Sequence, residues 1–229
     1  MPTPLETARA EPTSLKGRIL GAARSLFARS GFHGTSMRAV AREVDIDIST
    51  LYYHWHSKQE LFDGILEDLQ MDFEERLRTW ILASKDLPIE EGFDLAVEHL
   101  GPFFLDFDVV RVVMVSFFGE DPASEGWAIR SQRQLLRTLR TYTEKRFGAD
   151  SIPPEFDSTV LALISTMVVM VSSRDRFAHI LNTQSNSVPF RKLVIATLRR
   201  LVGSFVDSIA RQSRRNLAPG ESLPTPLMP

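Results

Sequence analysis

The sequence predicts an all-α protein, with an N-terminal three-helix domain that contains a helix-turn-helix and a larger helical domain, about nine helices in total. Apolar residues recur at helical spacing along almost the whole chain, and no run of alternating β-branched residues indicates a strand. Two short helical patterns near the N-terminus are separated by only two residues. Prolines divide the remainder into helical segments at about 90–106, 109–119, 123–147, 154–181 and 188–211.

The ends of the chain differ from its middle in composition. Residues 1–13 and 213–229 are polar, contain several prolines and lack helical periodicity, so we expect a disordered N-terminal arm and a disordered tail. Between them, residues 14–60 are expected to form the helix-turn-helix domain, and residues 61–212 the larger helical domain.

The composition excludes several kinds of site. The 229 residues include no cysteine, which excludes disulfides, cysteine-ligated zinc and thiol nucleophiles and fits a cytoplasmic protein. The first 14 residues lack the apolar segment of a secretory signal. The most apolar run, Val160 to Val171, spans 12 residues, whereas a membrane-spanning helix needs about 20. We therefore expect a buried helix there and no membrane partner.

Charge is unevenly distributed along the chain. The whole protein carries a formal net charge of −2. Residues 14–58, however, hold seven Lys or Arg and three acidic residues, a local charge of +4, which leaves −6 on the rest. A basic module on an acidic body suits a domain that binds phosphate groups.

Four helical patterns lie near the N-terminus. The first covers about residues 15–30 and ends at Gly31, a residue type that commonly terminates helices. Thr35 is predicted to cap the second helix, the third begins near Asp47, and Ser57 is predicted to cap a long fourth helix. Their inward-facing apolar residues are Ile19, Ala22, Ala23, Leu26 and Phe27, then Met37, Val40, Ala41 and Val44, then Ile48, Leu51, Tyr52 and Trp55, then Leu61, Phe62, Ile65, Leu66, Leu69 and Phe73.

Only Asp45 and Ile46 separate the second helix from the third. Helices of about nine residues are too short to be stable alone, so these two must cross over a tight turn and pack on the first helix. This is the helix-turn-helix geometry, in which the later helix can enter the major groove of DNA. The turn requires a residue that tolerates positive φ, and Asp45 can serve there although Gly is more common.

Polar side chains follow the outer side of the third helix. Hydroxyl groups and an imidazole lie within a few residues of one another, which suits contacts with phosphates and base edges. The residues that supply them are Ser49, Thr50, Tyr53 and His54, with Tyr52 able to turn its hydroxyl outward and with Arg38 and Lys58 near the starts of the flanking helices.

Several short segments between Ile19 and Ile65 match a known family at its spacing. They are Ala22-Ala23, Leu26-Phe27, Gly31-Phe32, Thr35-Ser36, Val40-Ala41, the run from Thr50 to Trp55 and the run from Ser57 to Leu61. This stretch, about a fifth of the chain, resembles the N-terminal domain of the TetR/AcrR family of regulators. The resemblance implies a dimeric, ligand-responsive repressor that binds a palindromic operator and needs no cofactor. A transcriptional activator is the alternative within the same family.

The resemblance also implies roles for individual residues. Thr35, Ser36 and Arg38 match positions that contact the DNA backbone from the start of the second helix. Positions that contact phosphates around the third helix are matched by Thr50, Tyr52, His54 and Lys58. Positions that commonly face bases are matched by Ile48, Ser49 and Tyr53.

Three features depart from the family pattern. Asp45 replaces the usual turn glycine, the segment Asp47-Ile48-Ser49 replaces one that is more often basic, and Trp55 stands where Phe is usual. Two acids beside the third helix would repel phosphate unless Asp47 caps that helix. We therefore expect the operator sequence and affinity to be affected rather than the fold.

The last two helices, at about 154–181 and 188–211, are expected to form a homodimer interface. Both carry wide apolar faces, which fits a four-helix bundle between two subunits, and an intramolecular core is the alternative. The middle helices are expected to hold a lipophilic or aromatic effector, because aromatic residues and Met line adaptable apolar cavities. The candidate pocket residues are Trp80, His99, Phe103, Phe104, Phe107, Met114, Phe117, Phe118, Trp127 and Arg130, with Arg133 as a further polar anchor.

Two other classes of protein compete with a DNA-binding regulator. An enzyme is disfavoured because the motifs GxGxxG, GxxxxGK[ST], GxSxG and HExxH are all absent. His54 and His56 are two residues apart, so on a helix they diverge, and we expect no metal site. A helical adaptor with a vestigial headpiece is the other alternative, because Asp45 and Asp47 oppose DNA binding.

Overall fold

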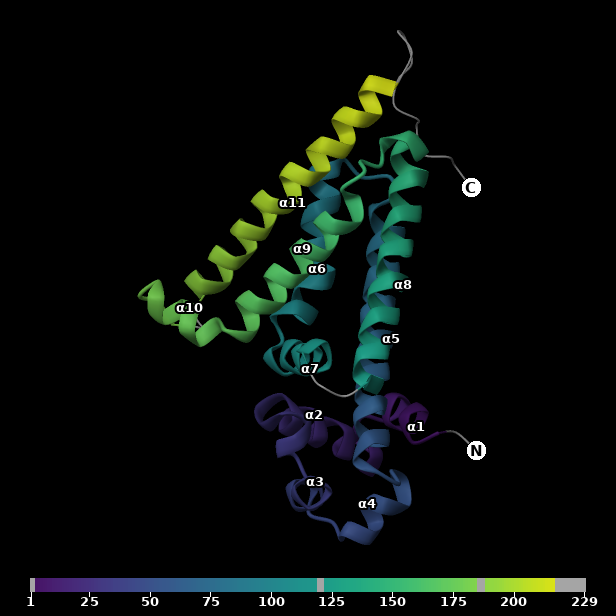
Figure 1. Ribbon diagram of the computed structural model, residues 1–229, viewed down its shortest axis with the longest axis vertical. Helices are drawn as coiled ribbons and strands as arrows, with labels where there is room; N and C mark the ends of the chain where they lie inside the picture. Colours follow the sequence, from purple (N-terminus) through teal and green to yellow (C-terminus); the bar gives the residue numbers. More distant parts are fainter. Residues whose placement is uncertain (1–2, 119–121, 185–187, 217–229) are drawn as a thin grey trace. The chain divides into compact units, whose positions relative to one another are not determined.

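The structure is a computed structural model that describes residues 3–118, 122–184 and 188–216 (Figure 1). Within these ranges it has eleven α-helices, one short 3-10 helix and no strand, which confirms the predicted all-α class. Two of them, α1 and α10, were not predicted as separate helices. The elements are α1 (Pro4–Ala10), α2 (Leu15–Gly34), α3 (Met37–Val44), α4 (Ile48–His54), α5 (Lys58–Ser84), α6 (Ile89–Leu105), α7 (Phe107–Phe118), α8 (Pro122–Phe147), η1 (Ala149–Ser151), α9 (Phe156–Ser172), α10 (Arg174–Ile180) and α11 (Val188–Asn216).

The described chain divides into two compact units. The first contains the residues up to Glu75 and those of Phe103–Ile129, and the second contains Arg76–Pro102 and the residues from Arg130 on. The first unit thus includes the helix-turn-helix and also α7, which lies beyond residue 60, where we placed a domain boundary. Contacts between α7 and α2 explain this division.

Side chains of α7 bond to α2 within the first unit. The hydroxyl of Ser25 donates a hydrogen bond to the carboxylate of Asp108, and Nε of Arg111 donates to the carbonyl oxygen of Ala28 at 3.2 Å. The start of α7 is fixed by Asp106, whose carboxylate accepts a hydrogen bond from the backbone amide of Asp108 at 2.9 Å. The packing of the helix-turn-helix unit therefore extends beyond the N-terminal helices.

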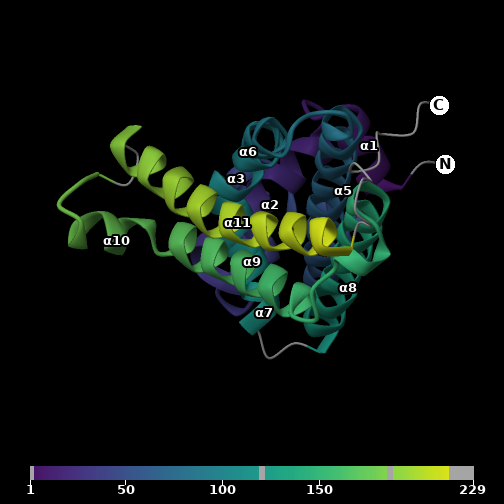
Figure 2. The same ribbon diagram turned by 90° about the horizontal axis from the view of Figure 1, so that it is seen from above.

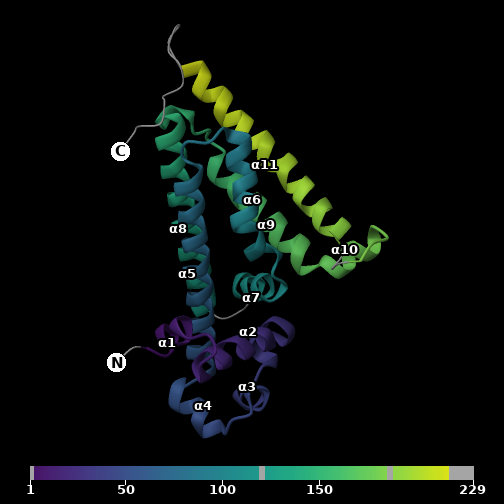
Figure 3. The ribbon, with the colours of Figure 1, turned by 180° about the vertical axis from the view of Figure 1, so that it is seen from behind.

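An aromatic and aliphatic core holds the N-terminal helices together. Ile19 and Phe27 of α2, Leu51 of α4 and Phe62 of α5 are fully buried. The rings of Phe27 and Phe62 meet edge to face at 4.9 Å, and the ring of Phe32 lies 5.2 Å from that of Phe62. Each such side chain stabilises the fold by about 2 kcal/mol through burial. The short helices α3 and α4, joined by a tight turn, depend on this core for their stability (Figure 3).

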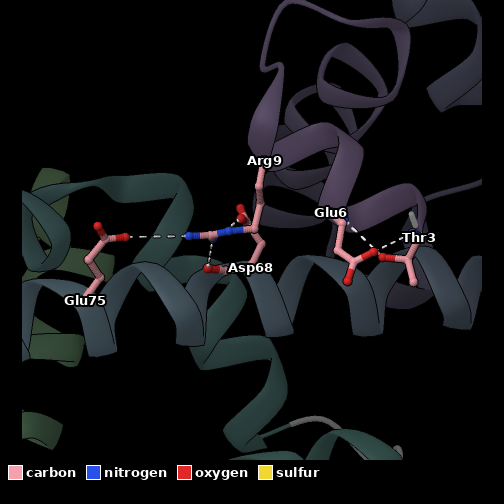
Figure 4. Close-up of polar contacts among 5 residues, drawn as sticks. All are labelled: Thr3, Glu6, Arg9, Asp68 and Glu75. Atoms are coloured by element: carbon pink, nitrogen blue, oxygen red, sulfur yellow. Dashed lines mark hydrogen bonds and ion pairs between the residues drawn. The ribbon is translucent and has the colours of Figure 1, made fainter. Parts of the chain in front are cut away.

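The N-terminal arm is helical, so the predicted disorder over residues 1–13 is wrong for α1. A capping box begins α1: the hydroxyl of Thr3 accepts a hydrogen bond from the amide of Glu6 at 3.1 Å, and the Glu6 carboxylate accepts one from the Thr3 amide at 2.7 Å. Arg9 donates to the carboxylate of Asp68 at 2.6 Å and lies 3.9 Å from that of Glu75 (Figure 4). Tertiary contacts with α5 thus stabilise a helix too short to show clear periodicity.

The segment between α1 and α2 lies directly on the first turn of α2. A Cβ atom at Gly17 would be 2.2 Å from the carbonyl oxygen of Pro12, so no side chain fits at this position. The hydroxyl of Ser14 caps α2 by accepting a hydrogen bond from the Gly17 amide at 3.2 Å. This glycine therefore permits the close approach of the arm.

In the second unit, α5, α6 and α8 are joined by side chains that bond to backbone carbonyl groups. Arg146 of α8 donates to the carbonyl oxygen of Ser84 at 2.7 Å. The indole nitrogen of Trp80 in α5 donates to the carbonyl oxygen of Gly92 in α6 at 2.8 Å. The Arg146 bond satisfies a carbonyl group at the end of α5, and the Trp80 bond joins α5 to the first turn of α6.

Helices α9 and α11 run side by side in the second unit (Figure 2). Phe156 of α9 is buried with Ile209 of α11, and its ring lies 5.5 Å from that of Phe205. The prediction of one helix over 154–181 is wrong, because α9 ends at Ser172 and α10 continues at an angle of 78°. Ser173 ends α9 and begins α10, and its hydroxyl-bearing side chain suits a helix terminus better than a helix interior.

The described part of the C-terminal tail continues α11. This helix extends to Asn216, so the predicted tail is helical over its first residues, and residues 217–229 lie outside the described range. Among the described helices, none is by itself long and apolar enough to cross a membrane, and only the bent pair α9 and α10 meets those criteria jointly.

Candidate nucleic-acid interface

The turn between α3 and α4 has the predicted conformation. Asp45 lies in the left-handed region, with φ 57° and ψ 57°, which confirms the prediction of positive φ at this residue. The amide of Ile46 donates a hydrogen bond to the carbonyl oxygen of Ala41 at 3.0 Å. Arg18 of α2 donates to the carbonyl oxygen of Val44 at 2.7 Å. The end of α3 is therefore closed by backbone and side-chain donors, which fixes the direction in which the chain enters α4.

Helix α3 begins one residue later than predicted, because Ser36 rather than Thr35 is its N-cap. The hydroxyl of Ser36 accepts a hydrogen bond from the amide of Ala39 at 3.2 Å. Thr35 is 3% exposed, and its hydroxyl donates to the carbonyl oxygen of Gly31 at 2.9 Å. Gly31 has φ 69° and interrupts helical geometry, as predicted. Ser36 stays exposed at the start of α3, whereas the Thr35 hydroxyl is bonded inside the domain.

Lys58 ties the start of α5 to the end of α2. Its ammonium donates hydrogen bonds to the carbonyl oxygens of Phe32 at 2.9 Å and of Thr35 at 3.1 Å, and it lies 4.3 Å from the centre of the Phe32 ring. The predicted cap at Ser57 is confirmed, since its hydroxyl accepts a hydrogen bond from the Glu60 amide at 3.0 Å. Lys58, which we predicted to grip phosphate, thus has partners within its own domain.

Helix α4 has one buried and one exposed side. Leu51 is fully buried, and Trp55, directly after the helix, is 2% exposed. On the other side Ser49 is exposed, Tyr52 is 45% exposed and Tyr53 is 78% exposed. The prediction that Tyr52 faces inward with Leu51 and Trp55 is therefore wrong for much of its side chain. Two large aromatic side chains therefore leave much of their surface accessible on the helix that was predicted to enter the major groove.

The remaining predicted contact residues differ in how accessible they are. Arg38 is exposed on α3. Thr50 and Ile48 are half-buried, and Ile48 packs against the core of the first unit. Ile48 therefore offers less surface to a base than Ser49 or Tyr53.

His54 lies at the end of α4 in a partly buried position. Burial, and next the positive charge of Lys16, lower the pKa of His54 below its ordinary value of 6.5. The ring also lies 5.1 Å from the ring of Tyr53. In the free protein, burial and the neighbouring Lys16 thus favour the uncharged imidazole.

Asp47 occupies the N-cap of α4, yet its side chain does not cap the helix. Its backbone carbonyl oxygen accepts hydrogen bonds from the amides of Thr50 at 3.0 Å and Leu51 at 3.3 Å. Its carboxylate makes no capping hydrogen bond, and the side chain is exposed. The capping contact that would have explained an acid here is therefore missing.

Trp55 fits the domain because a glycine lies beside it. A Cβ atom at Gly64 of α5 would be 3.4 Å from the indole nitrogen of Trp55. This is an ordinary contact distance, so a side chain that extends beyond Cβ at this position of α5 would press on the indole ring. The Trp that stands where the family usually has Phe therefore lies directly against α5 at Gly64.

The predicted effector-pocket residues are divided between the two units. In the first unit, Phe103 is buried and its ring lies 5.1 Å from that of Phe73, while Phe104 packs edge to face on Phe73 at 5.5 Å. Phe107 and Met114 are half-buried. These side chains therefore contribute to the packing of the first unit.

Trp127 differs from these residues because it carries a polar indole N–H group. Its indole nitrogen is buried and, within the part of the chain that the structure describes, has no hydrogen-bond partner. Such orphaned donors are uncommon in folded proteins. The side chains of Phe117 and Phe118 lie outside the described residues.

In the second unit the predicted pocket residues have other partners or are exposed. Trp80 bonds to the carbonyl oxygen of Gly92, and a ring nitrogen of His99 pairs with the carbonyl oxygen of Leu95 at 3.0 Å. Arg130 and Arg133 are exposed on α8.

Sequence reasoning missed two residues that position α4. Arg18 lies off the apolar stripe of α2 and looked like a solvated charge, and its bond to Val44 could be inferred only from the crossing of the helices. Gly64 lies inside a helical pattern, where glycine is unfavourable. That cost is the one indication in the sequence that a bulky neighbour, here Trp55, needs the space.

Helices α2, α3 and α4 around a shared core, with α4 partly exposed after a left-handed turn, define a helix-turn-helix DNA-binding domain. Residues 19–65 match the family model described as "Bacterial regulatory proteins, tetR family". The chain is 44% identical over 57 residues to the HTH-type transcriptional regulator UidR of Escherichia coli K12, covering 25% of this chain and 28% of UidR. It is 35% identical over 175 residues to IcaR of Staphylococcus aureus strain Newman, covering 75% of this chain and 91% of IcaR.

Solved structures share the fold at lower identity. A transcriptional regulator from Aquifex aeolicus VF5 has a TM-score of 0.57 at 18% identity, covering 82% of this chain and 97% of that one. GusR of Salmonella enterica has a TM-score of 0.53 at 20% identity, covering 84% and 100%. The chain belongs to the TetR family, whose members are helix-turn-helix transcriptional regulators, and it is not an enzyme. The resemblance found in the sequence is confirmed.

Proposed function

We propose that the protein represses transcription by binding a palindromic operator as a homodimer, and that a small lipophilic or aromatic effector releases it. The observation that carries this proposal is the outer side of α4, where Ser49, Tyr52 and Tyr53 are exposed while Leu51 and Trp55 anchor the helix. Exposed aromatic and hydroxyl groups on a rigidly held helix suit base edges and phosphates. IcaR is named as a negative transcriptional regulator, which favours repression over activation.

The exposure of each side chain divides the predicted DNA-contacting residues into those that can reach DNA and those that position the domain. Phosphate contacts are assigned to Ser36, Arg38, Thr50, Tyr52 and His54, and base contacts to Ser49 and Tyr53, with Ile48 in a lesser role. Thr35 and Lys58 bond to carbonyl oxygens inside the domain, so they are positioning residues.

Dimerisation is proposed through α9 and α11. One helix-turn-helix domain contacts too few base pairs to be specific for one DNA sequence. In a dimer, a twofold axis places two such domains at successive major grooves, which are about 34 Å apart. On α9, Ala162 and Val169 are exposed, and on α11, Leu193 and Leu201 are exposed. Exposed apolar residues on two adjacent helices suit an interface with a second copy.

A small effector is supported by orphaned donors in the first unit. The indole nitrogen of Trp127 and Nε of Arg24 are both buried without a hydrogen-bond partner in the described chain. A ligand acceptor would satisfy such a group and recover its desolvation cost of about 1–3 kcal/mol. The apolar and aromatic surroundings favour a ligand that is otherwise lipophilic.

The proposal is tested by a mobility shift with the DNA upstream of the protein's own gene, in a salt series. We expect saturable binding that Arg38→Ala weakens on all sequences, with a salt slope smaller by about one unit. Arg176→Ala is the matched control, because Arg176 is an exposed arginine on α10. Absence of saturable binding by the wild-type protein, on this DNA and on a random pool, would instead favour the adaptor with a vestigial headpiece.

The effector part of the proposal has a separate test. Thermal shift with acyl, steroid and aromatic compounds should find a ligand that raises the melting temperature and releases DNA. Trp127→Phe should weaken that ligand selectively. If no compound of these classes stabilises the protein, the proposed effector class is wrong.

A further inference from the structure

We propose that Asp47 selects a cytosine in each half of the operator, accepting a hydrogen bond from its N4 amino group in the major groove. This inference rests on the proposed operator binding and names a specificity-determining residue within it. Asp47 is exposed at the N-terminal end of α4, and its carboxylate makes no capping bond. In helix-turn-helix proteins, the N-terminal residues of the second helix contact base edges.

Of the two acidic residues near α4, Asp45 and Asp47, only Asp45 has a structural reason to be acidic. Asp45 has φ 57°, and aspartate is one of the few residue types besides glycine that adopts this conformation readily. The turn therefore accounts for Asp45. Asp47 has ordinary extended geometry, with φ −66° and ψ 144°, and its carboxylate makes no capping hydrogen bond to the helix that follows. A carboxylate that makes no capping bond would repel the phosphates of bound DNA. We infer that a hydrogen-bond donor on the DNA offsets this repulsion.

The chemistry of the major groove restricts which base can supply that donor. An ionised carboxylate only accepts hydrogen bonds, so the acceptors of guanine and thymine oppose it. Adenine presents its N6 amino group next to the N7 acceptor, which would face the second carboxylate oxygen. Cytosine presents its N4 amino group without a neighbouring acceptor on the same base. Cytosine is therefore the partner that Asp47 fits best.

The experiment selects operators from a random duplex pool with three full-length proteins: wild type, Asp47→Asn and Asp45→Asn. Each variant removes one negative charge near α4, and asparagine suits both an N-cap and a left-handed turn. We expect wild type and Asp45→Asn to enrich the same cytosine in each half-site. Asp47→Asn should replace it with adenine, because an amide pairs with adenine N6 and N7. Replacing that cytosine in the selected operator should weaken wild type at least about fivefold, and Asp47→Asn much less.

Each outcome separates this inference from the function on which it rests. If Asp47→Asn enriches the same operator as wild type, or if both variants change the same base, Asp47 does not read cytosine, although the protein still binds an operator. If wild type enriches no sequence at all, operator binding fails and this contact fails with it. A uniform gain in affinity for both variants, without a change of base, would show that the two acids act only through their charge.

Discussion

Lys58 and Phe32 are joined in two ways, since the Lys58 ammonium donates a hydrogen bond to the Phe32 carbonyl oxygen at 2.9 Å and lies 4.3 Å from the centre of the Phe32 ring. Phe32 follows Gly31, where α2 loses helical geometry, and its carbonyl oxygen also accepts a hydrogen bond from the Thr35 amide at 3.4 Å. One side chain thereby connects the start of α5 to the segment that leads into α3.

Lys58→Met should lower the free energy of unfolding by about 2 kcal/mol, because it removes hydrogen bonds from a charged donor and a cation–π contact. Urea unfolding followed by circular dichroism measures the change. Lys85→Met is the matched control, since Lys85 is an exposed lysine, and should change stability by less than about 0.5 kcal/mol. The salt slope of DNA binding should not change. A slope reduced by about one unit would place Lys58 on phosphate instead.

Trp55→Phe should destabilise the protein by about 1–2 kcal/mol, because it leaves part of the indole volume empty. Gly64→Ala in that background should recover about 1 kcal/mol, since its Cβ enters the vacated space and alanine favours the helix. A double-mutant cycle measures the coupling. Gly21→Ala serves as control, because a Cβ there has no neighbour within 4 Å. Equal coupling of both glycines to Trp55 would contradict the proposed fit.

Stability should decrease as the pH falls below about 6.5, in part through His54. Burial and Lys16 lower the pKa of His54 in the folded protein, so between that pKa and 6.5 the unfolded chain binds more protons than the folded one. The contribution is fully present above 6.5 and lost as the pH falls through the folded pKa. Melting temperatures across this range should depend less on pH in His54→Gln. An NMR titration that gives His54 a pKa above 6.5 would reverse the sign.

Leu201→Glu, combined with Val169→Glu, should convert the proposed dimer to a monomer in analytical ultracentrifugation, because charge placed on the proposed apolar interface is costly to bury. Leu82→Glu is the control, since Leu82 is at least as exposed but lies on α5. Far-ultraviolet circular dichroism should be unchanged in both. Persistence of the dimer in the double variant would place the interface elsewhere.

The sequence predicted the helix-turn-helix well because its determinants are local. Gly31 and Asp45 both adopt the positive φ that their positions suggested. Leu51 and Trp55 are buried as the helical spacing of α4 required. The pattern of apolar residues therefore fixes which side of α4 remains outside.

Features that depend on tertiary contacts were harder to predict. Arg9 of α1 donates a hydrogen bond to the carboxylate of Asp68, which lies 59 residues further along the chain. No local sequence pattern indicates a contact between residues so far apart. Thr35 and Ser36 are both good caps, and only the path of the chain after Gly31 decides between them. Ser173 divides α9 from α10, although apolar residues recur on both sides of it.

Among the described residues, the side chains of Ser49, Tyr52 and Tyr53 on the outer side of α4 take no part in the hydrogen bonds that hold the domain together. Arg18 closes the turn before α4, Lys58 ties α5 to the end of α2, and Leu51 and Trp55 anchor α4 from within. Substitutions at Ser49 would therefore alter recognition while leaving folding almost untouched. If α4 reads the operator as proposed, diversifying that helix face alone should re-target the protein to a new DNA sequence without rebuilding its scaffold.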